Sequence, residues 1–213
     1  MAVTLYYGSG SPYAWRVWLA LEHKSIPHEF KLVSFDGEDQ LKPEFVALNP
    51  RHRVPVLVDD GFALYESSAI MDYVAERWPD EPRLYDADLH RRAVQRRMMR
   101  ETDAYVTALL EKLADAIFST PAEKRDEAEI AKLKGKLAKE LALWEAALSG
   151  DYLVGGLSAA DLTFYPMVAL FLRLEMRHPA LATSTLLGPR LSGWNARMRA
   201  LPIVEKTWPP HWK

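Results

Sequence analysis

Two short segments of this sequence place side chains that could do chemistry at the expected beginnings of helices. Ser11-Pro12 follows an apolar run and a Gly-Ser-Gly break, and the pair is typical of a helix cap and a first helical residue. Glu66-Ser67 precedes a second helical pattern. The first N–H groups of a helix and its positive dipole end favour a carboxylate. The Glu66-Ser67 segment therefore predicts a carboxylate site, and Ser11 is the candidate for the chemistry.

The stretch between these segments predicts a place where an extended peptide can pair. Residues 49–55 read Asn-Pro-Arg-His-Arg-Val-Pro, and an apolar strand, an Asp-Asp-Gly turn and a second apolar strand follow. A proline at the start of an edge strand leaves one backbone edge open to another chain. The combined pattern favours a binding site for a small peptide.

The elements that must position these residues follow from the spacing of apolar side chains. Residues 3–7 and 28–33 have strand patterns, and helix patterns begin at Pro12, Pro43 and Ser67. With the hairpin at 56–64, the order is βαβ and then ββα. Two prolines and several charges at residues 78–82 mark a linker. The predicted domains are therefore 1–78, a linker at 79–87, and 88–213.

The second part of the chain shows only helical periodicity. One face of a long helix carries Met98, Tyr105 and Leu113, and a second apolar stripe runs from Ile130 to Leu148. Ser158 to Asp161 has the spacing of a capping box. The helix that follows is apolar on nearly every side and contains Pro166, where we expect a kink or a local repair. A last helix is predicted at residues 191–200.

Composition narrows the class of protein. The chain has 213 residues, 49% hydrophobic residues, a net charge of −2 and no cysteine. This balance is typical of a soluble globular protein and argues against nucleic acid as the main partner. The sequence shows no membrane span and no signal peptide, so we expect a cytoplasmic location. Without cysteine, and with six scattered histidines, we expect no metal site, and any thiol must come with a ligand.

Over essentially its whole length, the sequence resembles the cytosolic glutathione transferases. The likeness is carried by residues 11–17 (Ser-Pro-Tyr-Ala-Trp-Arg-Val), by residues 49–57, by Glu66-Ser67 and by the box at 158–161. It implies an α/β, thioredoxin-like N-terminal domain followed by an all-α C-terminal domain. The early serine and the Asn-Pro-x-His-x-Val-Pro pattern are most similar to the serine-type classes (delta, theta or zeta).

The resemblance implies that Ser11 donates a hydrogen bond to the sulfur of glutathione. A thiol of pKa near 8.5 is mostly protonated at neutral pH, and lowering that pKa by roughly two units takes about 2.7 kcal/mol. One hydrogen bond to a charged group contributes about 1.5–3 kcal/mol, and a helix N-terminus about 0.3–1 kcal/mol more. A serine can therefore suffice without a general base. Ser9, Tyr6, Tyr7 and Tyr13 remain alternatives, of which Tyr6 or Tyr7 is the main one, because some transferase classes use a tyrosine at the end of the first strand.

The same resemblance implies the residues that bind glutathione. A cis Val54–Pro55 peptide bond would turn the Val54 backbone toward the cysteinyl unit. Ser67 would hold the γ-glutamyl carboxylate and Glu66 would face the ammonium group. His52, and with less support Arg53, would lie near the glycine carboxylate, which Gln40 or Lys42 could also reach.

The resemblance further implies a pocket for the second substrate between the domains, with Tyr13, Tyr105, Trp208 and His211 as candidate lining residues. Asp161 is expected to be structural. The predicted activity is activation of glutathione as a thiolate and its transfer to a hydrophobic electrophile, by a cytoplasmic homodimer in a detoxifying role. A glutathione-dependent isomerase or dehalogenase, or a binding module without activity, remains an alternative. Ser11-Pro12-Tyr13 differs from the Ser-Ser-Cys motif usual in zeta isomerases.

Overall fold

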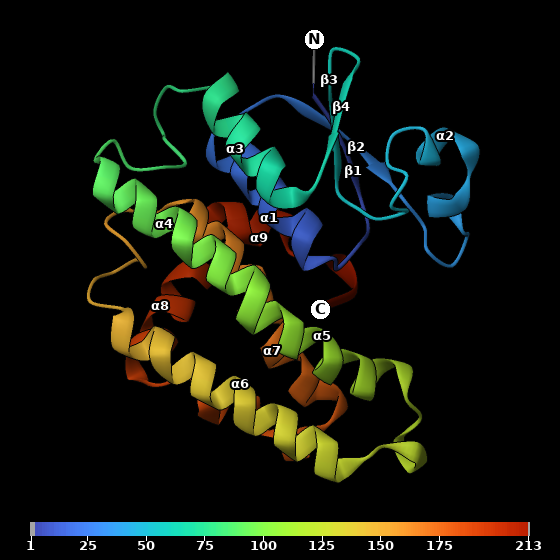
Figure 1. Cartoon of the computed structure of the whole chain (residues 1–213), viewed down its shortest axis with the longest axis vertical. Helices are drawn as coiled ribbons and strands as arrows, with labels where there is room; N and C mark the ends of the chain where they lie inside the picture. Colours follow the sequence, from blue (N-terminus) through green and yellow to red (C-terminus); the bar gives the residue numbers. More distant parts are fainter. Residues whose placement is uncertain (1–2, 213) are drawn as a thin grey trace. The chain divides into compact units, whose positions relative to one another are not determined.

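The computed structural model describes residues 3–212, which form two compact units. The first contains residues 3–85 together with 201–212, and the second contains residues 86–200. Figure 1 shows the sheet in the first unit and the long helices in the second. The connector from Trp78 to Asp88 has no regular structure and ends where α4 begins.

The sheet of the first unit is mixed. Within residues 3–212 it has four strands in the order β2-β1-β3-β4. Strand β1 (Val3–Tyr7) pairs in parallel with β2 (His28–Leu32), whereas β3 (Val56–Asp59) is antiparallel to both β1 and β4 (Phe62–Tyr65). The parallel pair requires a crossover, and α1 (Pro12–His23) provides it.

Helices cover both faces of this sheet. Alternation along β1 and β3 turns Leu5 and Leu57 toward one face, where both are buried and where α1 packs with α3 (Ser67–Arg77). The short helix α2 (Pro43–Val46) lies on the other face, where Phe45 packs with Val56 (Figure 1). The fold is thus the thioredoxin-like arrangement that the sequence predicted.

The end of the chain belongs to the first unit. Helix α9 (Pro202–Thr207) packs against α1, and the 3-10 turn η7 (Pro210–Trp212) follows it. The prediction that residues 88–213 form one helical domain did not foresee this return. By contacts, the helical unit begins at Asp86 and ends at Ala200.

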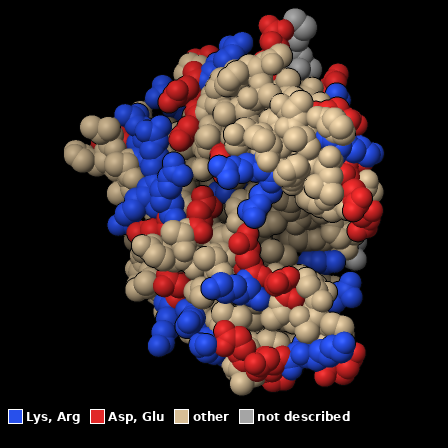
Figure 2. All heavy atoms as spheres, turned by 45° about the vertical axis from the view of Figure 1, so that its right-hand side comes forward, with Lys and Arg blue, Asp and Glu red and all other residues tan. Residues whose placement is uncertain are grey.

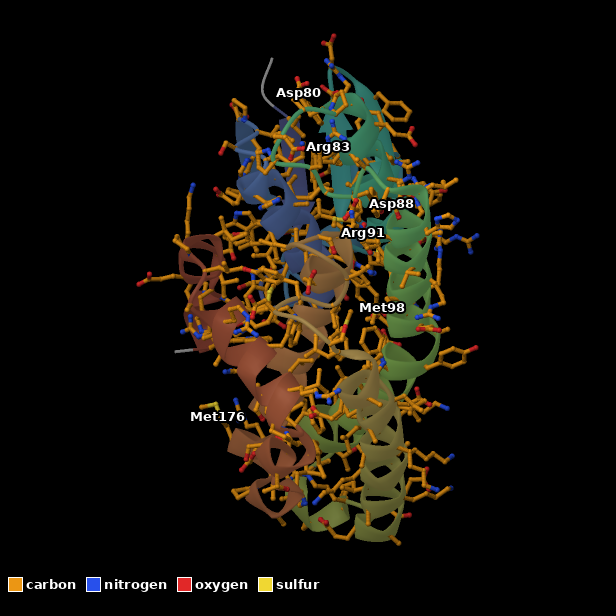
Figure 3. All side chains as sticks on the ribbon, turned by 90° about the vertical axis from the view of Figure 1, so that its left-hand side faces the viewer. Asp80, Arg83, Asp88, Arg91, Met98 and Met176 are labelled. Carbon is orange, nitrogen blue, oxygen red and sulfur yellow. The ribbon has the colours of Figure 1, made fainter. Side chains whose placement is uncertain are left out.

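The second unit is built from long helices. Helix α4 (Leu89–Glu101) is capped by Asp88, whose side chain accepts a hydrogen bond from the Arg91 N–H (Figure 3). It continues through a π-helical segment (Thr102–Thr107), α5 (Ala108–Ala114) and a second π-helical segment (Asp115–Ser119). In the first π segment the Thr107 hydroxyl donates to the Thr102 carbonyl. Periodicity did not reveal these segments. The other helices are α6 (Glu127–Ala147), α7 (Ala159–Arg177) and α8 (Pro189–Arg199). A 3-10 turn at Ala122–Lys124 precedes α6, residues 148–158 connect α6 to α7 without regular structure, and 3-10 turns at Pro179–Leu181 and Thr183–Leu186 connect α7 to α8.

Helix α7 lies at the centre of this unit and contacts α4, α5 and α8. It runs through Pro166 as one continuous helix. The predicted capping box is present: the Asp161 carboxylate accepts hydrogen bonds from the Ser158 N–H and hydroxyl. The same carboxylate also accepts from the Leu153 N–H and the Trp194 indole N–H, both at 2.9 Å. Burial raises the pKa of Asp161, and these four donors oppose that shift. Asp161 therefore connects a loop, the start of α7 and α8.

On the face that Figure 2 shows, basic groups gather along the left edge, and elsewhere acidic and basic groups lie side by side. In residues 3–212, none of the helices is long and apolar enough to cross a membrane. No cluster of three potential metal-ligating side chains occurs in that part of the chain.

Candidate glutathione site in the first unit

Ser11 lies at the junction of β1 and α1. Its N–H donates to the Gly8 carbonyl at 3.1 Å, which closes a tight turn over residues 8–11. Its hydroxyl oxygen accepts one hydrogen bond, from the Ala14 N–H at 3.3 Å, as an N-cap does. The hydroxyl is partly exposed, and its proton can still be donated. This arrangement offers a donor to an anion at the start of a helix.

Ser67 is the first residue of α3, and a buried arginine supports it from below. The Arg16 Nε atom donates to the Ser67 hydroxyl oxygen at 2.9 Å, and Arg16 is only 1% exposed. A hydroxyl that accepts from a guanidinium can still donate its own proton to another acceptor. The site thus combines a positive charge, a hydroxyl donor and a helix N-terminus, which suits a carboxylate. Sequence reasoning missed Arg16, although a cation inside an apolar helix face was a signal.

The residue before Ser67 has an unusual backbone. Glu66 adopts φ +70°, and His52 adopts φ +56°. Positive φ in a residue other than glycine costs on the order of 1–3 kcal/mol and is concentrated at functional sites. Both residues were predicted to bind glutathione, but positive φ also occurs at Ser25, Glu38, Asp60 and Ala182, outside the predicted site, so it does not by itself mark the site.

A buried asparagine shapes the loop that carries His52 and Arg53. The Asn49 amide donates to the Arg53 carbonyl at 2.6 Å, and its oxygen accepts from the Arg51 N–H at 2.9 Å. The His52 ring lies 3.1 Å from the Gln40 carbonyl oxygen. Lys42 is paired with Asp39. This loop therefore has a fixed conformation, and Asn49 is a second residue whose role the sequence did not reveal.

The Val54–Pro55 peptide bond is cis, as predicted. The ladder between β1 and β3 ends at the pair Tyr6 and Val56, so Val54 lies beyond it. Proline at residue 55 is compatible with this position because the ladder needs no N–H there.

The two tyrosines of β1 have other surroundings. The Tyr7 ring packs against Trp18 and Phe30 at centroid distances of 5.7 and 5.5 Å. The Tyr6 hydroxyl accepts a hydrogen bond from Lys31. The Tyr7 ring is thus packed against α1 and β2, and the Tyr6 hydroxyl is engaged by a lysine of β2.

The residues predicted to line a second-substrate pocket are distributed over both units. In the first unit, the Arg16 guanidinium lies 5.1 Å from the centre of the Tyr13 ring, Trp208 packs edge-on against Trp15, and His211 bonds to Ser9. Tyr105 belongs to the second unit. Their role toward an electrophile stays a prediction.

Tyr105 lines a pocket of about 400 Å³ that α4, the first π-helical segment and α6 form within the helical unit. Met98, on α4, lies on the inner side of that helix (Figure 3). The remaining lining residues are Arg97, Glu101, Glu140, Leu143, Trp144 and Ala147. Its lining combines the buried apolar side chains of Met98 and Trp144 with the charged side chains of Arg97, Glu101 and Glu140.

Comparison with known proteins agrees with this architecture. Residues 10–77 match the family model described as glutathione S-transferase, N-terminal domain, and residues 85–202 match the C-terminal domain. Glutathione S-transferase A from Pleuronectes platessa is 28% identical over 99% of this chain and 92% of its own. A crystal structure of a glutathione S-transferase from the Antarctic clam Laternula elliptica has a TM-score of 0.84 and 30% identity, over 100% of this chain and 94% of its own.

A glutathione transferase from Pseudomonas putida, solved with glutathione disulfide bound, shares the fold with a TM-score of 0.86. It is 22% identical and covers 97% of this chain and 90% of its own. Both domain matches are in the expected order and together span most of the sequence. The chain belongs to the glutathione S-transferase family of enzymes.

Proposed function

We propose that this enzyme is a serine-type glutathione transferase that ionises the thiol of glutathione and adds it to an electrophilic carbon. The proposal rests on the N-termini of α3 and α1, which belong to the same unit. At the start of α3, the Ser67 hydroxyl accepts a hydrogen bond from the buried Arg16 guanidinium. At the start of α1, the Ser11 hydroxyl has a proton to donate. The first suits a carboxylate and the second suits a developing thiolate.

Ser11 acts as the donor to the sulfur. Its oxygen is only weakly engaged by the Ala14 N–H, so the hydroxyl can turn toward a ligand. A hydrogen bond to a thiolate contributes roughly 1.5–3 kcal/mol, enough to lower the thiol pKa by one to two units. The thiolate then attacks the electrophile, and a leaving group departs or a proton is added to the neighbouring atom. No metal takes part in this step as proposed.

The remaining residues hold the tripeptide. The Ser67 hydroxyl and N–H bind the γ-glutamyl carboxylate, Glu66 faces its ammonium group, and Val54 pairs with the cysteinyl backbone. His52 and Arg53 lie near the glycine carboxylate. The Asn49 side chain supports this assignment, because its two hydrogen bonds brace the loop that carries His52 and Arg53.

The proposal is tested with glutathione-affinity resin and a chloronitrobenzene conjugation assay. We expect retention and turnover by the wild-type enzyme. Ser67→Ala should raise the KM for glutathione about five- to twentyfold with kcat little changed, because it removes ground-state binding. Ser119→Ala, at an exposed serine of the helical unit, is the matched control. An unchanged KM in Ser67→Ala would contradict the carboxylate assignment.

The alternatives give distinct results in the same experiment. Retention without conjugation would point to a dehalogenase if hydrogen replaced the chlorine while glutathione was oxidised to its disulfide. It would point to an isomerase if an added isomerisable substrate was converted with glutathione regenerated. Retention without turnover on a broad panel of electrophiles would point to a binding module. Loss of retention would contradict glutathione as the cosubstrate.

We infer a homodimer, as the resemblance suggested. Around this pocket the helical unit exposes Tyr105 and Leu143 (57% and 65%), and the charged side chains of Arg97, Glu101 and Glu140 line the same pocket. Charges of both signs around an apolar patch can pair with themselves across a two-fold axis. Leu143→Glu should convert the dimer to a monomer in light scattering, and a monomeric wild type would contradict the inference. A cytoplasmic, detoxifying role remains part of the proposal.

A further inference from the structure

The C-terminal segment 208–212 packs onto the start of α1 within the first unit. The Trp15 indole N–H donates to the Thr207 hydroxyl at 2.7 Å, in a buried position. Trp208 and Trp212 each meet the Trp15 ring edge-on, at centroid distances of 5.4 and 5.5 Å. Edge-to-face aromatic packing favours one arrangement of the rings. The end of the chain is therefore anchored beside residue 15.

The same segment contacts the turn that leads to Ser11. The His211 Nδ1 atom lies 3.0 Å from the Ser9 hydroxyl oxygen. A Cβ atom added to Gly10 would lie 2.7 Å from the His211 ring and 2.9 Å from the Trp212 ring. Gly10 has φ +79°, as the third residue of a type II turn requires. His211 and Trp212 thus contact both central residues of the turn.

This contact bears on chemistry because the Ser11 side chain makes only one long cap bond, so the place of the hydroxyl follows the Ser11 backbone. That backbone is held on one side by the Trp15 N–H, which donates to the Ser11 carbonyl at 2.9 Å, and on the other by the turn that Gly8 and Ser11 close. A displacement on the order of 1 Å at a reacting centre can cost about a hundredfold in rate. A residue that fixes the turn therefore bears on the donor.

We propose that His211 is a positioning residue, and that the C-terminal segment 208–212 sets the place of the Ser11 hydroxyl through Ser9 and Gly10. This role differs from contact with the electrophile, which the sequence had suggested for His211. The inference rests on the proposed function, because it needs Ser11 to serve the thiol. It does not require His211 to touch substrate.

A double-mutant cycle on Ser9 and His211 tests the coupling. Ser9→Ala and His211→Ala should each lower kcat about fivefold, leave the KM for glutathione within about twofold, and raise the pKa of the bound thiol, measured from thiolate absorbance against pH. The double variant should be no slower than either single variant, because both remove one hydrogen bond. Additive losses would overturn the proposal.

Two further variants separate positioning from general damage. His211→Asn places an amide atom near the site of Nδ1 and should restore most of kcat. His90→Ala removes an exposed histidine of α4 and should change nothing. Thermal unfolding of each variant should stay close to that of the wild type, since both His211 and Ser9 are exposed.

The outcomes distinguish this inference from the proposed function. If Ser11→Ala loses turnover while His211→Ala matches the wild type in kcat and thiol pKa, only the positioning role fails. If Ser11→Ala keeps full turnover, the proposed function fails, and the inference fails with it. A wild-type enzyme that binds no glutathione would overturn both.

Discussion

The starts of α1 and α7 both carry a serine cap, yet their surroundings differ. Ser158 is buried, and its hydroxyl and N–H both donate to Asp161, which takes two further donors from Leu153 and Trp194. Ser11 is partly exposed and accepts a single 3.3 Å bond. The cap of α7 is saturated, whereas the cap of α1 keeps a proton to donate.

The difference shows how one local motif serves stability in one unit and supports chemistry in the other. A buried polar group is costly unless its hydrogen bonds are made, and the Asp161 carboxylate of this cap accepts four of them. A partly exposed cap loses little when it leaves one donor to solvent. A helix start with spare donors and access to solvent is therefore the better candidate for a site.

The largest effect is expected at the saturated cap. Asp161→Ala removes the acceptor of four donors and leaves the Trp194 and Leu153 N–H groups buried without a partner. We expect a loss of roughly 3–5 kcal/mol in the free energy of unfolding. Urea denaturation measures it, with Asp161→Asn as the milder comparison. The molecules that still fold should keep their specific activity. A fully folded but inactive variant would contradict a purely structural role for the Asp161 cap.

Substitution of Ser11, the cap of α1, should lower the turnover rate more than the stability. Ser11→Ala should slow turnover about 10- to 100-fold, which is about 1.4–2.7 kcal/mol of barrier. It should lower the free energy of unfolding by less than about 1 kcal/mol. Ser158→Ala is the matched variant and should show the reverse, with normal turnover and lower stability. Steady-state kinetics and unfolding of both variants decide between the two roles.

A comparison of Gly10 with Gly61 tests whether the C-terminal segment contacts the turn before α1. Gly10 and Gly61 both have positive φ, but only a Cβ at Gly10 would meet neighbours, His211 and Trp212, whereas Gly61 has open space. Gly61→Ala should cost about 1 kcal/mol from backbone conformation alone. Gly10→Ala should cost about 2 kcal/mol and also lower turnover. Equal losses of stability and equal rates would contradict the contact.

The smallest effect is expected at Tyr7, whose hydroxyl is an alternative donor to the thiol. Tyr7→Phe keeps the packing against Trp18 and Phe30, so turnover should stay within about twofold and stability within about 0.5 kcal/mol. If Tyr7→Phe proved inactive while Ser11→Ala remained active, the tyrosine would be the thiol donor.

Much of the fold could be predicted because its signals are local. The β1 and β2 patterns, the Ser11-Pro12 cap and the Ser158–Asp161 box each lie within a few residues, and the structure has them where expected. The paths of the final segment and of the π-helical segments were not predicted. Aromatic packing across the chain decides the first, and the second depends on carbonyl partners such as the Thr102 oxygen that periodicity cannot show.

The sequence by itself determined the order of strands and helices, the cap residues and the family, since these depend on side-chain type and short spacing. Only the tertiary structure decided which cap is saturated and which keeps a donor. Arg16 meets Ser67 across 51 positions, Trp194 meets Asp161 across 33, and His211 meets Ser9 across 202. Burial brings these groups together, and no local pattern specifies which distant partner will satisfy a polar group.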